Sequence, residues 1–192
     1  MKSKIVLALC VAVFAASLGI TNAADLRFSM DRKKLSQKNF TEGGDKQGSQ
    51  AMKVDVRDIV YTIIVESESL RDLENFTVEY NIYYEEAPPP QQGRGNPNEP
   101  KPQATPKTFA GKHTIEKLAS RKKTEFDTGS ITIKEVSSGG RGGSRGGGGG
   151  GSGQAKDRVV GSIIRAHDAE GKLLGEYINP ANIASKFEWR KP

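Results

Sequence analysis

The chain has 192 residues, of which 35% are hydrophobic and 27% are charged, and its formal net charge at pH 7 is +6. This length fits one domain with appendages. The single cysteine, Cys10, excludes a disulfide framework, a multi-cysteine zinc site and an iron–sulfur cluster, and two histidines offer little for a metal or acid–base centre.

Residues 1–24 have the pattern of a secretory signal peptide. Two lysines precede an apolar run over 5–20, and small residues follow it. The run is shorter than the roughly 20 residues of a membrane span, so the pattern predicts export with cleavage after Ala23 or Ala24. We therefore expect a periplasmic, cell-surface or extracellular protein that meets the membrane only through the cleaved peptide.

Three segments are too polar or too simple in composition to supply a core. Residues 25–50 are predicted to be a polar N-terminal segment with few apolar anchors. Residues 87–106 hold seven of the nine prolines, and residues 138–154 hold eleven of the twenty-two glycines. Neither insert can bury enough apolar surface to offset the entropy of ordering it, so both are predicted to be disordered.

Outside these inserts, apolar and polar residues alternate along 51–192, with the period of two that predicts strands. The first clear strand covers 61–66, and the clearest one covers 76–85. The inward face of the second strand is predicted to consist of Phe76, Val78, Tyr80, Ile82 and Tyr84. Tyr83 then lies on the opposite face, where we expect it to be exposed.

Later segments predict further strands and a hairpin. Residues 112–118 and 123–136 alternate in the same way, and Gly129 is expected to break the longer run. Residues 159–166 and 173–178 form a hairpin whose loop includes a glycine suited to a positive φ.

A short helix is predicted after this hairpin, with Asn179 as its N-cap and Pro180 at its first position. Ile183 and Phe187 would share its inner face, and Trp189 would seal the end of the core. Together these elements predict an all-β protein, an immunoglobulin-like antiparallel β-sandwich of about seven strands with a short C-terminal helix.

Three stretches also resemble a known family. Within 51–86, 107–136 and 158–189 the chain reads, in order, IVYTIIVESESLRDLENFTVEYNIYYEE, HTIEKLASRKKTEFDT and GSIIRAHDAEGKLLGEYINP. These runs resemble secreted immunoglobulin-like β-sandwich proteins of Verrucomicrobia and related bacteria, one of which is associated with type IV pilus genes. The resemblance implies a pilus or secretion context, and it carries over no catalytic residue because the family has no active-site motif.

The sequence predicts no catalytic residue, cofactor or metal ligand. His113 and His167 lack the accompanying motifs of a hydrolase or a zinc enzyme, so we expect them to face solvent at strand ends. Asp168, Glu170 and Gly171 lack the spacing of a calcium loop and are predicted to form a plain turn.

A nucleic-acid partner is not expected either. The glycine-rich insert contains only two arginines, Arg141 and Arg145, and no aromatic side chain on which a base could stack.

The leading functional hypothesis is a non-enzymatic protein that acts through protein–protein contacts at strand edges or sheet faces. Its partners would be pilus or secretion components or further copies of itself. The alternative is a carbohydrate- or mucin-binding module that uses Tyr83 as an aromatic contact.

Overall fold

The computed structural model describes residues 25–43, 51–89, 102–138 and 154–192. The predicted signal peptide lies outside these residues, as do residues 90–101 and 139–153 of the two inserts. Within the described part of the chain, no helix is long and apolar enough to cross a membrane.

The described residues form nine strands and one short 3₁₀ turn. In chain order they are β1 (Leu26–Glu42), β2 (Met52–Ser67), β3 (Leu73–Glu86), β4 (Thr105–Leu118), β5 (Lys123–Asp127), β6 (Ile131–Ser138), β7 (Gln154–Lys156), β8 (Arg158–His167), β9 (Leu173–Asn179) and η1 (Ile183–Ser185).

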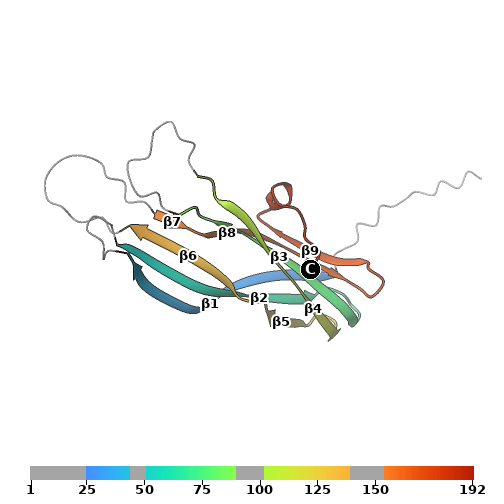
Figure 1. Ribbon diagram of the computed structural model, residues 1–192. Helices are drawn as coiled ribbons and strands as arrows, with labels where there is room; N and C mark the ends of the chain where they lie inside the picture. Colours follow the sequence, from blue (N-terminus) through green and yellow to red (C-terminus); the bar gives the residue numbers. More distant parts are fainter. Residues whose placement is uncertain (1–24, 44–50, 90–101, 139–153) are drawn as a thin grey trace, which may run out of the picture.

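The strands form two antiparallel sheets that pack as a sandwich. Sheet A has the order β1-β2-β6-β7, with β5 also paired to β2, and sheet B has the order β4-β3-β8-β9. In Figure 1, β1, β2 and β6 run side by side toward the end of the molecule at which β7 lies. The predicted all-β sandwich is confirmed.

The strand order is that of an immunoglobulin-like domain. In such domains, strands A, B and E share one sheet, while strands C, F and G share the other, with C′ beside C where it is present. Here β1, β2 and the β5–β6 pair take the places of A, B and E, and β4-β3-β8-β9 reads C′-C-F-G. Because β5 and β6 pair with successive parts of β2, they occupy one position in this order. The structure has more strands than the roughly seven predicted, because β1 and the short β7 were not expected.

The core lies between the inner faces of the sheets. On β2, Tyr61, Ile63 and Val65 are buried as predicted, and β3 contributes a matching buried row. Gly129 separates β5 from β6, also as predicted. The alternation of apolar residues therefore gives the correct inner face for both central strands.

The segment 25–50 differs from its prediction, because most of it is strand β1. Leu26 and Phe28 are buried in the core, and Met30 packs against it. The rest of the strand is polar, but its backbone pairs with β2 over the whole length of β1. These hydrogen bonds join residues that are far apart in sequence, so the polar composition does not reveal them.

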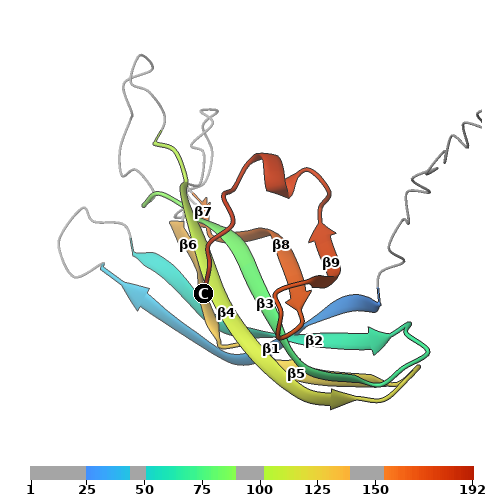
Figure 2. The same cartoon turned by 90° about the vertical axis from the view of Figure 1, so that its right-hand side faces the viewer.

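The C-terminal helix is also shorter than predicted. Asn179 is the last residue of β9, and the chain forms only the three-residue turn η1, with Asn182 at its N-cap. Ile183 is buried and Phe187 packs beside it, so the predicted inner face of this segment is correct. In Figure 2 the segment arches beside β8 and β9, away from β1 and β2.

Asp157 joins the two sheets where the chain passes from β7 to β8. One carboxylate oxygen accepts from the backbone N–H of Ala87, just after β3 in sheet B, at 2.8 Å. The other accepts from the backbone N–H of Lys134, on β6 in sheet A, at 2.9 Å. One side chain therefore fixes both sheets at this end of the sandwich.

Candidate functional site

Strand β1 forms an outer edge of sheet A. One side of it pairs with β2 along its full length. On its other side, β9 lies close to the start of β1, where a Cβ on Gly175 would be 2.6 Å from the Leu26 carbonyl oxygen. Beyond that contact, no strand among the described residues pairs with this side of β1. An edge of unpaired backbone groups is a template for a further strand.

Hydrogen bonds on β2 identify the backbone groups that β1 leaves unpaired. Tyr61 donates its N–H to the Thr128 hydroxyl at 3.0 Å, and its carbonyl accepts from the Thr128 N–H at 2.8 Å. Both groups of Tyr61 therefore point away from β1. Arg32 lies opposite Tyr61, so its own N–H and C=O point outward. The same alternation adds Lys34 before the register irregularity and Gln37, Asn39 and Thr41 after it. Together with Arg32, these residues form what we call the open β1 edge.

Basic side chains dominate this part of β1. Between its acidic residues at 31 and 42, the strand carries four cations and no carboxylate: Arg32, Lys33, Lys34 and Lys38. Within the described residues only Lys33 makes an ion pair, at 3.4 Å with Asp127, and both side chains are more than half exposed. An exposed pair of this kind contributes little, so most of the positive charge remains available.

The four cations are divided between the two faces of the strand. Arg32 and Lys34 lie opposite core residues of β2 and share the inner face, whereas Lys33 and Lys38 share the outer face. A strand added to this edge would therefore meet positive charge on both of its faces.

Two exposed apolar side chains accompany these cations. Leu35 is 61% exposed and occupies the register irregularity of β1. Phe40 is 42% exposed and lies opposite Val54, which in turn lies opposite Val136. Phe40 is thus the outer end of an apolar row across three strands.

Strand β4 forms an edge of sheet B, and acids from neighbouring residues offset its charge. Lys107 pairs with Glu86 at 3.5 Å. Lys117 lies 3.0 Å from Asp72 and 3.5 Å from Glu74. These lysines are already matched within the domain, in contrast to the cations of β1.

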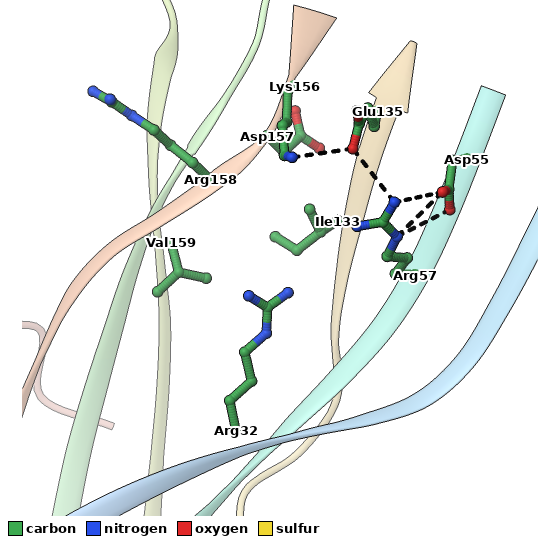
Figure 3. Close-up of a pocket in the computed structure, with 9 residues that line it drawn as sticks. All are labelled: Arg32, Asp55, Arg57, Ile133, Glu135, Lys156, Asp157, Arg158 and Val159. Atoms are coloured by element: carbon green, nitrogen blue, oxygen red, sulfur yellow. Dashed lines mark hydrogen bonds and ion pairs between the residues drawn. The ribbon is translucent and has the colours of Figure 1, made fainter. Parts of the chain in front are cut away.

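A cavity of about 180 Å³ opens between the sheets beside β1 (Figure 3). Ile133 and Val159 form its apolar part. The Arg57 guanidinium lies 2.6 Å from an Asp55 oxygen and 3.4 Å from Glu135. On the other side of the cavity, a second arginine rises from β1.

This second arginine is Arg32, and it differs from the other cations of the cavity. Lys156 pairs with Glu135 at 3.2 Å, and Arg158 pairs with Glu85 at 2.8 Å. Among the described residues, no carboxylate lies within ion-pair distance of Arg32. The cavity therefore presents one cation that can accept an additional carboxylate.

The ion pair within the cavity is held in its charged form. The hydrogen bond from Arg57 is the largest effect that lowers the pKa of Asp55, and burial opposes it. The same hydrogen bond raises the pKa of Arg57. Both groups therefore remain ionised and unavailable for proton transfer near neutral pH.

The expected exposure of Tyr83 is wrong. Its side chain is 0% exposed and packs with Ile163 and Ile183 in a second apolar cluster. Its ring centroid lies 4.8 Å from that of Phe187. The C-terminal segment covers this face of β3, so Tyr83 cannot contact a glycan or a partner.

The histidines lie in separate environments. His113 is exposed as expected, but it lies within β4 rather than at a strand end, and it stacks on Phe126 with ring centroids 4.1 Å apart. His167 ends β8 as expected, but it is half-buried and so does not fully face solvent as predicted.

Asp168 shapes the turn that follows β8. Its carboxylate accepts from the backbone N–H groups of Glu170 and Lys172, while Gly171 adopts φ 82°. This turn confirms the predicted hairpin geometry. Over the described ranges, no three acidic, cysteine or histidine residues form a group that could hold a metal.

The four cations of β1 are evident in the sequence, but composition alone does not show that the strand carrying them is a sheet edge. Their significance depends on which strands flank β1. The alternation of Leu26, Phe28 and Met30 is the local feature that could have revealed the strand.

No known protein family and no curated protein matches this chain. Among solved structures, it is similar to SoR45, a Northeast Structural Genomics Consortium target, at 7% identity and a TM-score of 0.37, covering 80% of this chain and 81% of that one. It is also similar to a protein from Akkermansia muciniphila, at 12% identity and a TM-score of 0.28, covering 87% of this chain and 78% of that one. A protein of Bordetella pertussis described as ApaA matches at 10% identity and a TM-score of 0.29, covering 80% of this chain and 91% of that one. At TM-scores this low, the likeness supports no conclusion about function, and the fold assignment depends on the strand order above.

Proposed function

We propose that this chain is an exported, non-enzymatic, immunoglobulin-like protein that acts through protein–protein contacts at its open sheet edges. The observation that carries the proposal is the open β1 edge, where outward-facing backbone groups coincide with unmatched positive charge. The predicted signal peptide supports export. The resemblance to pilus-associated proteins makes a pilus or secretion component the class of partner we propose, with self-association as the other route.

The physical mechanism is strand addition. An extended segment of the partner would pair its backbone with an open edge, so that main-chain hydrogen bonds supply affinity. Side chains on the two faces of the added strand would then supply specificity, because they meet the side chains of the edge strand at about 5 Å. The sandwich already orders the edge strand, which limits the entropy lost on binding.

Site-specific photo-crosslinking of the full chain in its producing cells tests this function. A photoreactive residue would replace Thr41 on β1, Lys112 on β4 or, as a control, Glu170 in the exposed hairpin loop. We expect a discrete crosslinked protein from at least one edge position and none from the loop. The proposal fails if neither edge position gives a product, or if all three positions give the same products.

Cell fractionation tests export separately. We expect the protein in the exported fraction with a mature N-terminus at residue 24 or 25. An intact N-terminus in the cytoplasmic fraction would contradict this part of the proposal.

A further inference from the structure

We infer that the open β1 edge binds an acidic, extended segment of a partner protein, which adds to sheet A as a further strand. This inference rests on the proposed function and deepens it, because it assigns the partner's chemistry and selects one of the two open edges.

The backbone provides the first step of the argument. The outward groups of Arg32, Lys34, Gln37, Asn39 and Thr41 lie along one continuous strand. At about 3.3 Å per residue, the stretch from Arg32 to Thr41 is about 30 Å long, at the upper end of the usual strand lengths. An incoming segment of about ten residues can therefore pair along the whole of the open β1 edge.

The charge of the edge provides the second step. Arg32 and Lys34 would face one side of the added strand, and Lys33 and Lys38 would face the other. Opposite charges directly across two strands stabilise their pairing, and like charges destabilise it. Acidic residues are therefore favoured on either face of the incoming segment.

Arg32 provides the third step. It lines the cavity between the sheets, and among the described residues no carboxylate lies within ion-pair distance of it, so its guanidinium can accept a carboxylate from the inner face of the added strand. A guanidinium binds a carboxylate through two parallel hydrogen bonds, which fixes both position and orientation. Arg32 thus offers one specific contact in addition to the general attraction of the lysines.

The same charges argue against two other arrangements. Pairing of β1 with β1 of a second copy would place cations opposite cations, which destabilises a symmetric edge contact. The β4 edge attracts an acidic strand less strongly, because Lys107 and Lys117 already have carboxylate partners within the domain.

A labelled peptide provides the test. The probe has about ten residues of alternating Glu and Thr, and its matched control replaces each Glu with Lys. Fluorescence anisotropy would follow binding of each peptide to the purified protein at low and high salt. We expect binding of the acidic peptide only, with weaker binding at high salt because screening reduces charge attraction.

Three variants locate the binding. The charge reversal Lys33→Glu/Lys38→Glu should weaken binding about tenfold or more, since attraction becomes repulsion at two positions. Asn39→Pro should also weaken it, because proline removes an outward N–H and is tolerated at a sheet edge. Lys112→Glu, on β4, is the matched control and should leave the affinity unchanged. Circular dichroism and thermal unfolding would establish that each variant is folded. If Asn39→Pro does not fold, the charge-reversal variant alone decides whether the peptide binds at β1.

The outcomes separate the two proposals. Absence of peptide binding, or binding unaffected by the β1 variants, would overturn this inference. Loss of binding in Lys112→Glu alone would assign the contact to β4 and would also overturn it. Crosslinks from Lys112 but not from Thr41 would have the same meaning, and in both cases the proposed protein-binding function would stand.

Discussion

The two sheets of this sandwich have very different outer faces. On sheet B, Tyr83 of β3 is 0% exposed because the C-terminal segment packs over it. On sheet A, the outer face carries Asp58, whose carboxylate accepts from the hydroxyls of Ser36 and Thr132 at 2.7 and 2.8 Å. One face is covered by the chain's own C-terminal segment, whereas the other combines polar groups such as Asp58 with the apolar row of Phe40, Val54 and Val136, beside an open edge. The difference shows why β3 contributes to stability on both of its faces, whereas the outer face of sheet A lacks such a cover among the described residues.

The largest expected effect concerns the covered face of sheet B. Tyr83→Ala should destabilise the protein by about 3–5 kcal/mol, because it removes a large buried ring and leaves a cavity under the C-terminal segment. Phe40→Ala, on the outer face of sheet A, should change the free energy of unfolding by no more than about 0.5 kcal/mol. Urea unfolding at pH 7 measures both values. Equal values would mean that the two faces do not differ as described.

The next effect concerns the connection between the sheets. Asp157→Ala should destabilise the protein by about 1–3 kcal/mol, because the backbone N–H groups of Ala87 and Lys134 lose their acceptor. Glu170→Ala, in an exposed loop, is a suitable control with little expected effect. Thermal unfolding of both variants would check this, and an unchanged transition in Asp157→Ala would show that the two hydrogen bonds are not needed.

A smaller loss of stability should follow when the C-terminal segment is held less firmly against sheet B. Arg165 lies 4.5 Å from the Trp189 ring centroid and 2.6 Å from Glu176. Arg165→Gln should cost about 1 kcal/mol, since it removes a cation–π contact and a partly exposed ion pair. Exchange of the amide protons of residues 183–189 should also become faster. Unchanged exchange in that segment would show that Arg165 does not hold the cover in place.

The smallest effect concerns the pH dependence of stability that comes from Asp58, on the outer face of sheet A. The hydroxyls of Ser36 and Thr132 are the largest causes that lower the pKa of Asp58. A lowered folded-state pKa gives stability that is present above the unfolded value, near 3.9, and is lost as pH falls through the folded value. Asp58→Asn should therefore lose less Tm between pH 7 and pH 3 than the unchanged protein. An identical loss in both would contradict the assignment.

The elements that sequence alternation predicts correctly are those whose burial is decided locally. Phe76, Val78 and Ile82 identify the inner face of β3, and Gly171 identifies the hairpin turn. In both cases the periodicity or the turn chemistry of a few neighbouring residues is sufficient.

The features that were missed depend on contacts between distant parts of the chain. Strand β1 is polar over most of its length, and its pairing with β2 cannot be read from composition. Alternation places Tyr83 on the outer face of β3 but says nothing about what covers that face. The open β1 edge depends in the same way on sheet order, although its cations are visible in the sequence.

Residue-resolved amide exchange tests the open β1 edge most directly, with and without the acidic peptide. In the free protein, we expect the amides of Arg32, Lys34, Gln37, Asn39 and Thr41 to exchange quickly, while those of Lys33 and Lys38, which face β2, exchange slowly. Saturating peptide should slow the first group and leave the second unchanged. Protection of the first group in the free protein, or no change when peptide is bound, would contradict the account.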